Sequence, residues 1–320
     1  MLLSEFDYDL PEELIAQEPV EPRDHSRLMV VNHQTGEICH DRFFNLPVYL
    51  RPDDLVVFNQ TMVFPARIYG HKETGGRVEV LLLRNSPPWK FISKPSLKDG
   101  QRVVFNSVLE AIVRNGQLVF NVDLDDVMPI LADIGYTPLP PYINARGQVS
   151  SAKQMRSRYQ TVYAKDVGSV AAPTAGFHFT NELLEKIPNK AFVTLHVGLG
   201  TFVPVKTENI EDHTMHTEQF SVPANLRSQI AYHKRTIAVG TTTARVLESD
   251  WTKPDTNIFI YPGYKFKHVD ALITNFHLPK STLLMLVSAF AGRELIMHAY
   301  QEAIAKKYRF YSFGDAMLIL

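Results

Sequence analysis

The sequence predicts an α/β protein whose larger domain, with helices on a mixed sheet, carries an inserted antiparallel β-barrel domain. Between Asp54 and Val122 short strand-forming runs follow one another with turns between them and no intervening helical pattern, which is typical of a small antiparallel barrel or sandwich. After Ser150 strand-forming and helix-forming runs alternate, which is typical of a sheet covered by helices. The strands before residue 60 would otherwise lack partners, so we expect the barrel to be an insertion.

The first part of the larger domain is predicted to span residues 1–59. A helix is expected to begin at Asp9-Leu-Pro-Glu-Glu13, where a proline lies near the first turn. The polar loop 21–27 leads into a strand at Leu28–Val31, and a second strand is expected at Leu55–Phe58. These two strands would join the sheet formed by the second half of the chain.

The inserted β-barrel domain is predicted to span residues 60–150. Two hairpin turns are explicit, at Glu73-Thr-Gly-Gly76 and at Asn115-Gly116, and the second is the strongest short hairpin signal. The proline-rich run Pro138–Ile143 favours extended chain and suits a domain boundary. The predicted strands are Ala66–Gly70, Val78–Leu83, Phe91–Ser93, Arg102–Phe105, Leu109–Val113 and Leu118–Val122.

The second part of the larger domain is predicted to span residues 151–320. A helix capped by Thr180 is expected to end at Pro188. Further helices are predicted at Leu226–Lys234 and from the turn at Gly240 through Glu248, and long helices are expected from Thr282 to Lys307. The predicted strands are Ala191–His196, Thr236–Val239, Ile258–Tyr261 and Ala271–Thr274.

The composition indicates an ordinary globular protein of 320 residues, of which 45% are hydrophobic. The single cysteine, Cys39, excludes an internal disulfide framework and a cysteine-clustered metal site. The chain turns acidic directly after Met1, which argues against a signal peptide. Its longest apolar run, Leu283–Gly292, is shorter than the roughly 20 residues that a membrane span needs. We therefore expect a soluble cytoplasmic protein.

The charges are unevenly distributed, although 33 basic and 34 acidic residues leave a net charge of only −1. No Asp or Glu occurs between Ile134 and Lys165, a stretch in which cations alternate with tyrosines. Cations bind phosphates and aromatic rings stack on unpaired bases, so this face suits nucleic acid; a solvated loop face is the alternative. The candidate contacts are Arg146, Lys153, Arg156, Arg158 and Tyr159.

Small residues dominate the stretch Gly168–Phe202, in which two glycine-rich runs each contain a histidine, His178 and His196. Glycines leave backbone amides uncovered, so another molecule can approach the main chain closely. Tight turns are the alternative explanation, but two such runs favour a binding site. The residues expected to bind a substrate here are Gly176, Gly198, Gly200 and Thr201.

A second candidate binding element is the strand-to-helix turn Gly240-Thr-Thr-Thr-Ala-Arg245. Free amides and hydroxyls at a helix N-terminus can hold an anion, either a phosphate or a carboxylate. The turn lacks the spacing of a Walker phosphate loop, and no Gly-x-Gly-x-x-Gly follows a strand, which weakens a dinucleotide-binding interpretation. We assign Gly240, Thr241, Thr242 and Arg245 to substrate binding.

Titratable side chains gather in Glu211-Asp-His-Thr-Met-His-Thr-Glu218. The pattern could bind a metal, but it lacks a third ligand at a recognisable spacing. Acid–base chemistry fits better, because imidazole and carboxylate exchange protons near neutral pH. His216 and Glu218 are the candidates here, and His277 is a further one at a strand end. Each of these histidines could equally be a satisfied structural group.

Taken together, these motifs resemble the S-adenosylmethionine:tRNA ribosyltransferase-isomerase family of queuosine biosynthesis. The resemblance runs from Phe6-Asp-Tyr-Asp-Leu-Pro-Glu-Glu-Leu-Ile-Ala16 to the C-terminal block 308–318, and includes His213-Thr-Met-His-Thr-Glu218. One departure is Asn59-Gln-Thr-Met-Val63, where the family usually has Asp and Arg in place of Gln60 and Met62. Loss of an ion pair would explain the paired change.

The resemblance implies that the ribosyl unit of S-adenosylmethionine is transferred to 7-aminomethyl-7-deazaguanine in a tRNA anticodon, giving epoxyqueuosine and releasing adenine and methionine. It also implies a two-domain monomer without a metal or a permanently bound cofactor. We expect proton transfer by His178, His196, His216 and Glu218, with S-adenosylmethionine held by the glycine-rich loops. The rival functions are an S-adenosylmethionine-dependent tRNA methyltransferase and a non-catalytic tRNA-binding protein.

Overall fold

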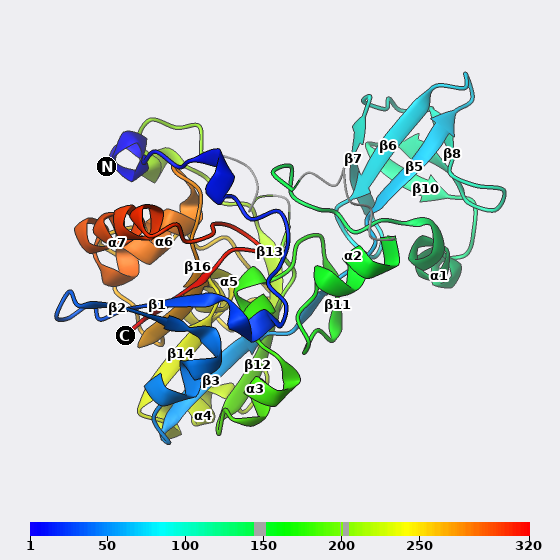
Figure 1. Ribbon diagram of the computed structural model, residues 1–320. Helices are drawn as coiled ribbons and strands as arrows, with labels where there is room; N and C mark the ends of the chain where they lie inside the picture. The colour runs from blue at the N-terminus through cyan, green and yellow to red at the C-terminus, as the bar shows by residue number, and fades with distance from the viewer. Residues whose placement is uncertain (144–151, 199, 201–204) are drawn as a thin grey trace.

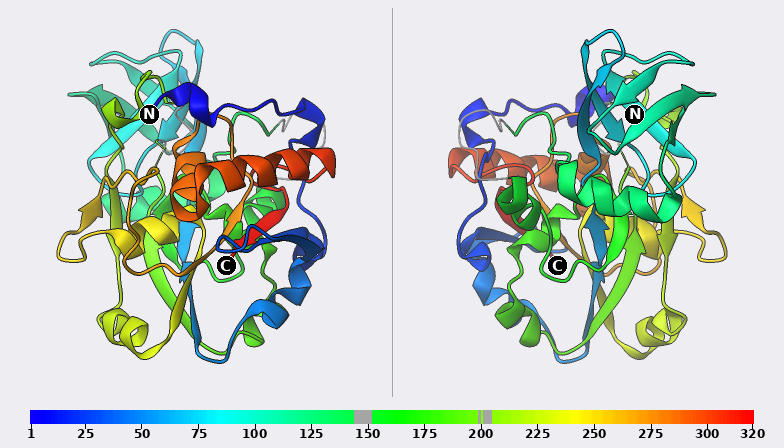
Figure 2. Two further views of the ribbon diagram at one scale, coloured as in Figure 1. Left: turned by 90° about the vertical axis from the view of Figure 1, so that its left-hand side faces the viewer. Right: turned by 90° about the vertical axis from the view of Figure 1, so that its right-hand side faces the viewer.

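The structure is a computed structural model that describes residues 1–143, 152–198, 200 and 205–320, with the side chains of residues 152–154 left out. Figure 1 shows a large layered unit of helices and strands and a smaller unit of strands beside it. Both termini lie on the large unit (Figures 1 and 2). The mixed α/β class with a separate antiparallel unit is therefore confirmed.

A nine-stranded mixed sheet forms the centre of the large unit, in the order β15-β13-β12-β3-β14-β16-β17-β1-β2. Strands β12, β3, β14 and β16 run parallel to one another, whereas β17 and β1 run in the opposite direction. The strands are β1 (Arg27–Val31), β2 (Ile38–Arg42), β3 (Asp54–Asn59), β12 (Lys190–Leu195), β13 (Glu218–Ser221), β14 (Arg235–Val239), β15 (Asp255–Thr256), β16 (Ala271–Asn275) and β17 (Ala316–Ile319).

Both faces of this sheet are buried, because successive side chains of a strand point to opposite sides. In β3, Leu55 and Val57 belong to a core with helices α5 (Thr241–Glu248), α6 (Thr282–Ala291) and α7 (Arg293–Ala305). Val56 and Phe58 belong to the opposite core, which includes Phe179 and residues of α3 (Asn181–Glu185). Helix α4 (Leu226–Tyr232) contributes Leu226 to the first core.

The carboxyl ends of the four parallel strands lie at one edge of the sheet. From β3 the chain next enters the sheet on one side, at β12, whereas from β14 it continues on the other side, at β16. Adjacent parallel strands whose connections leave in opposite directions open a crevice at their carboxyl ends, where α/β proteins bind ligands. In this sheet the crevice is expected where β3 and β14 end, at Asn59 and Gly240.

The small unit is an antiparallel sheet of six strands, β10-β7-β6-β5-β8-β9, in which β9 also pairs with β10. Its inward side chains, such as Ile68, Val80 and Val113, share one core with Leu131 of helix α1 (Leu124–Ile134). Asn115 and Gly116 both have positive φ, as a two-residue hairpin turn requires. The strands are β5 (Arg67–Lys72), β6 (Arg77–Leu82), β7 (Trp89–Lys94), β8 (Arg102–Val104), β9 (Glu110–Arg114) and β10 (Gln117–Phe120).

Two short strands, β4 (Thr61–Val63) and β11 (Asp166–Ser169), pair in parallel where the chain leaves the large unit and returns to it. Helix α2 (Ala152–Arg158) precedes β11 on the return path (Figure 1). Directly after β11, the amide of Val170 donates to the carbonyl of Val197 at 3.0 Å. The two glycine-rich runs predicted to form a site therefore lie side by side.

One predicted strand was wrong, and one helix was not predicted. Residues 258–261 form no strand, since the strand in this part of the chain is β15. The long helices expected between Thr282 and Lys307 are α6 and α7, which are separated at Gly292, whose φ is 90°. Helix α1 follows the last strand predicted for the inserted domain and was not itself predicted; a proline inside it, Pro129, weakens the helical pattern.

Within the described ranges, no single helix is long and apolar enough to cross a membrane. Helices α6 and α7 meet those criteria only as a pair, and the pair is bent by 115°.

Candidate active site at the carboxyl edge of the sheet

His196 directly follows β12, at the crevice. Its Nδ1 lies 2.8 Å from the Thr61 hydroxyl, which in turn lies 2.8 Å from the Ser169 hydroxyl. Burial lowers the pKa of His196, and the nearby Asp166 carboxylate opposes that shift. The imidazole is therefore largely neutral at physiological pH and able to accept a proton.

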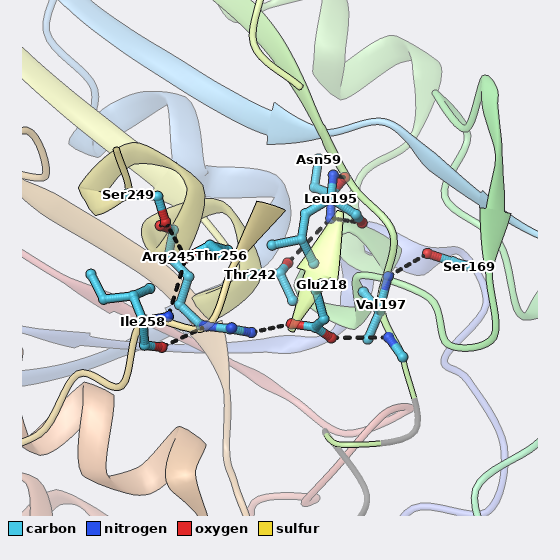
Figure 3. Close-up of polar contacts among 11 residues, drawn as sticks. Asn59, Ser169, Leu195, Val197, Glu218, Thr242, Arg245, Ser249, Thr256 and Ile258 are labelled. Carbon is cyan, nitrogen blue, oxygen red and sulfur yellow. Dashed lines mark hydrogen bonds and ion pairs between the residues drawn. The ribbon is translucent and has the colours of Figure 1, made fainter. Parts of the chain in front are cut away.

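A buried ion pair lies at the same edge of the sheet, between Glu218 at the start of β13 and Arg245 on α5. Figure 3 shows the Glu218 carboxylate pointing toward the Arg245 guanidinium group. The other carboxylate oxygen accepts from the amide of Gly198 at 2.9 Å. Glu218 therefore ties the second glycine-rich run to helix α5, and it is a fixed anion at this edge.

The ends of β3, β12 and β14 are joined by Asn59. Its side chain accepts from the Leu195 amide at 3.0 Å and donates to the Thr242 hydroxyl at 3.4 Å (Figure 3). Gly240 precedes α5 with a φ of 89°, which strongly favours glycine. The first turn of α5, with its buried Thr241 and Thr242, is thereby aimed at the crevice predicted from the strand order.

His178, in contrast, is a buried group with both ring nitrogens engaged. Its Nδ1 lies 2.7 Å from the Ser26 hydroxyl, and its Nε2 lies 3.3 Å from the Asn275 amide nitrogen. Burial, reinforced by nearby Arg309, lowers its pKa to about 3. His178 is therefore neutral and has no free nitrogen to exchange a proton with a substrate.

A cavity of about 110 Å³ lies next to Asn275 on the same edge. Its walls are mainly aromatic and aliphatic, and Tyr142 stacks on Tyr311 with ring centroids 4.6 Å apart. His277 lines this cavity, bonded through Nε2 to the Thr274 hydroxyl at 2.8 Å. A larger hollow of about 530 Å³ around Arg235 opens at the opposite edge of the sheet, away from the carboxyl ends where ligands bind in this class of fold.

The two buried histidines predict a pH-dependent stability. Burial lowers the pKa of His277, like that of His178, to about 3. Between about pH 6.5 and 3 these two histidines therefore bind protons in the unfolded chain but not in the folded one. The contribution of the two histidines to the free energy of unfolding is fully present above about pH 6.5. It falls as the pH drops, by about 2 kcal/mol per histidine between pH 7 and 5. Urea unfolding at the two pH values measures this loss, and a His178→Leu variant should lose about half of the difference. An unchanged difference in that variant would contradict the assignment.

Most of the predicted glycines are needed by side chains of this chain itself. A Cβ on Gly168 or Gly200 would lie 2.5 Å from the ring of His196 or His216, and one on Gly176 would lie 1.9 Å from the Tyr163 hydroxyl. Gly198 differs, because its nearest neighbour is the Glu218 side chain at 3.9 Å. The expectation that these glycines expose main chain to a ligand therefore applies best to Gly198. Thr201 lies outside the described residues.

The predicted tRNA contacts are only partly at the surface. Tyr159 has no exposed area and lines the cavity beside Asn275, so its placement on an RNA surface was wrong. Arg156 donates to the carbonyls of Ala132 and Gly135, at the C-terminal end of α1. Arg158 is half-buried. Arg146 and the side chain of Lys153 lie outside the described part of the chain.

Among the residues that the structure describes, no group of three or more His, Cys, Asp or Glu side chains could hold a metal ion. His216 is exposed, and Glu218 is engaged with Arg245.

A family model described as queuosine biosynthesis protein matches residues 3–319. The chain belongs to this family. It is 50% identical to the S-adenosylmethionine:tRNA ribosyltransferase-isomerase of Halothermothrix orenii and 52% identical to that of Symbiobacterium thermophilum, with all of both chains covered in each case. It is also similar to the crystal structure of the S-adenosylmethionine tRNA ribosyltransferase of Thermotoga maritima, with 39% identity, a TM-score of 0.56, and 99% of this chain and 100% of that chain covered.

In this member of the queuosine biosynthesis family, Gln60 replaces the usual acidic residue without leaving the position unpaired. Its amide donates to the Asp166 carboxylate at 2.9 Å, and the Thr194 hydroxyl donates to the same oxygen. The two hydrogen bonds, that of Thr194 foremost, lower the pKa of Asp166 although burial opposes them. A carboxylate is therefore kept next to His196 by a residue on β11.

Several residues of this edge were not predicted from the sequence, namely Ser26, Asn59, Thr61, Asp166, Ser169 and Asn275. Asn59 and Asn275 are the last residues of β3 and β16. A polar residue at the carboxyl end of a predicted parallel strand was the available signal. For Ser26 and Ser169 the sequence offers none, because their partners are distant in the chain.

Proposed function

We propose that this protein is an S-adenosylmethionine:tRNA ribosyltransferase-isomerase. It transfers and isomerises the ribosyl unit of S-adenosylmethionine onto 7-aminomethyl-7-deazaguanine in tRNA, giving epoxyqueuosine and releasing adenine and methionine. The observation that carries this proposal is identity of about 50% over the full length of relatives with that name. The enzyme acts as a monomer in the cytoplasm, without a permanently bound cofactor.

The reaction needs a base near the ribose C5′, because the adjacent sulfonium acidifies its hydrogens, and an acid that protonates the departing adenine. His196, His216 and Glu218 are proposed for these proton transfers. His196 is the first choice for the base, since burial lowers its pKa and its Nδ1 is oriented by Thr61. His178 instead supports the site through Asn275.

We assign the carboxylate of the methionine part to the N-terminus of α5, at Gly240, Thr241 and Thr242. A helix N-terminus offers unpaired amides and a partial positive charge to a carboxylate. Arg245 lies on the same helix, and its Nη2 is buried without a hydrogen-bond partner among the described residues. A cation with a spare donor near this turn supports an anionic ligand. Gly198 and Gly200 would complete the wall, with His277 on the neighbouring strand end.

The tRNA is assigned to the second domain and its junction. We propose that residues 60–150 form an inserted β-barrel domain and residues 1–59 and 151–320 the catalytic domain. Two exposed tyrosines, Tyr69 on β5 and Tyr136 after α1, contact each other with ring centroids 5.5 Å apart. Cations surround them on the outer strands, including Arg77 and Lys94. Exposed rings among cations suit unstacked bases and phosphates, and Arg156 and Arg158 extend this surface.

This surface predicts that Tyr69→Ala together with Tyr136→Ala weakens tRNA binding by about tenfold or more, since stacking on one ring contributes roughly 1–3 kcal/mol per base. Affinity for S-adenosylmethionine should stay unchanged, because the rings lie outside the catalytic sheet. Fluorescence anisotropy with labelled tRNA measures the first quantity and calorimetry the second. Tyr232→Ala is the matched control, since Tyr232 is exposed on α4 of the large unit. Equal tRNA affinity in the double variant and the control would rule out this surface.

Product analysis tests the proposed function directly. The protein is incubated with S-adenosylmethionine and tRNA that carries the deazaguanine precursor, and the small products are separated. Free adenine and methionine in equal amounts are expected. S-adenosylhomocysteine would instead indicate a methyltransferase, and tRNA binding without any product would indicate a non-catalytic binding protein.

A further inference from the structure

The cavity next to Asn275 has the size and lining of a site for a neutral flat ring. Its volume of about 110 Å³ is several times the ~10–15 Å³ that one water molecule needs. The described residues that line it include Tyr142, Tyr159 and Tyr311 but no Asp, Glu, Lys or Arg. A charged amino acid moiety would find no counter-ion here, whereas an aromatic ring would find aromatic walls.

Two residues in the lining of this cavity have a buried polar atom without a hydrogen-bond partner among the described residues, namely the hydroxyl of Tyr159 and Oδ1 of Asn275. The Asn275 amide nitrogen donates to the Tyr311 carbonyl at 3.0 Å and points its other hydrogen at Nε2 of His178. The Asn275 residue is only 2% exposed, and its Oδ1 atom has no hydrogen-bond partner among the described residues. An unpaired buried acceptor is costly, so this oxygen is suited to a donor brought by a ligand.

A hydrogen bond to His178 fixes the orientation of the Asn275 side-chain amide. Because the Asn275 amide donates to Nε2, that nitrogen is unprotonated, and Nδ1–H donates to the Ser26 hydroxyl at 2.7 Å. Ser26 precedes β1, so three distant segments hold one amide in place. If the amide rotated by half a turn, its oxygen would face the Tyr311 carbonyl oxygen and the lone pair of His178 Nε2. Both contacts would be repulsive, so the amide keeps the orientation described here.

We propose that this cavity binds a purine-like ring whose exocyclic amino group donates to Oδ1 of Asn275, with His178 as the residue that positions the amide. The inference rests on the proposed function, which supplies two such rings: the adenine of S-adenosylmethionine and the 7-deazaguanine base of the tRNA. Both rings are flat, uncharged and bear an exocyclic amino group; the aminomethyl substituent of the deazaguanine is a cation and would lie outside the cavity, whose described lining contains no Asp or Glu. Thr174 and Ser312 offer hydroxyl groups to the ring nitrogens from the same lining.

Equilibrium binding to the whole protein tests the proposal without any turnover. Calorimetry compares two pairs of probes: adenine with purine, which lacks the amino group, and 7-aminomethyl-7-deazaguanine with its analogue that lacks the 2-amino group. We expect the protein to prefer the amino-bearing member of one pair by about tenfold or more. The pair that shows this preference identifies which of the two rings occupies the cavity.

Three variants and a control separate a binding role from a structural one. Asn275→Leu should abolish the preference, and His178→Leu should reduce it, since the amide is then free to rotate. Ala172→Leu fills the cavity from another wall and should remove binding of both members of the pair while Asn275 stays intact. Asn225→Leu, on the exposed start of α4, is the matched control and should keep the preference.

The proposal is overturned if neither pair shows a preference, or if Asn275→Leu and Ala172→Leu bind the probes as the unaltered protein does. Either result would leave the release of adenine from S-adenosylmethionine, and thus the proposed function, untouched. Conversely, if the protein prefers the amino-bearing probe but releases no adenine from S-adenosylmethionine, the assignment of the cavity is supported and the proposed reaction is ruled out.

Discussion

Replacing Arg245 by methionine is expected to lower the free energy of unfolding by about 3–5 kcal/mol, because it leaves the buried Glu218 carboxylate without its counter-ion. The Glu218 and Arg245 side chains are only 4% and 5% exposed, so water cannot replace the lost partner. Urea unfolding of the variant measures the effect. The same change should greatly reduce turnover, since Glu218 also holds the Gly198 amide.

A double-mutant cycle separates this pair from its surroundings. Glu218→Gln combined with Arg245→Met removes both charges and should recover part of the lost stability. Lys253→Met is the control, because Lys253 and Asp250 form an ion pair whose side chains are 67% and 53% exposed, and such pairs contribute about 0–1 kcal/mol. Equal losses in the Arg245 and Lys253 variants would refute the importance of burial here.

A single methyl group at Gly168 is expected to reduce kcat by about a hundredfold, which is the cost of displacing a catalytic group by roughly 1 Å. In the Gly168→Ala variant the new Cβ would lie 2.5 Å from the His196 ring, so the imidazole must move away from Thr61. The affinity for tRNA should change little, because Gly168 is buried on β11, outside the six-stranded unit. Steady-state kinetics with saturating tRNA measures kcat.

Gly76→Ala is the matched control, since a Cβ at Gly76 meets nothing within 4 Å. His196→Ala should be as slow as Gly168→Ala, and the combination no slower than either, because both changes remove the same group. Full activity of a folded Gly168→Ala variant would show that the position of His196 does not limit the reaction.

The elements that could be predicted are those in which local chemistry decides the structure. Short runs rich in apolar residues identified β3, β6 and β12, and Asn115-Gly116 identified the hairpin between β9 and β10 because both residues need positive φ. The run at 258–261 has the same apolar character but forms no strand. Whether such a run pairs depends on neighbours supplied by distant parts of the chain, which propensity does not describe.

The residues of the candidate site likewise divide into those that the sequence could predict and those that it could not. The sequence placed His196, Gly198, Glu218 and the Gly240 turn in one neighbourhood, and the hydrogen bonds of Glu218 and Asn59 join them. It could not distinguish His178 from His196. Their difference lies in the hydrogen bonds of His178 to Ser26, 152 positions away in the chain, and to Asn275, which together engage both of its ring nitrogens.

The two strands that carry the second unit are also the ones that hold His196. Thr61 on β4 touches one side of the imidazole, and Gly168 on β11 faces it from another. Binding of a large polynucleotide could tilt the six-stranded unit. Such a tilt would move these two strands and, with them, the groups that contact the His196 ring. The proposed tRNA surface and the proposed base, His196, are thus joined through two short paired strands.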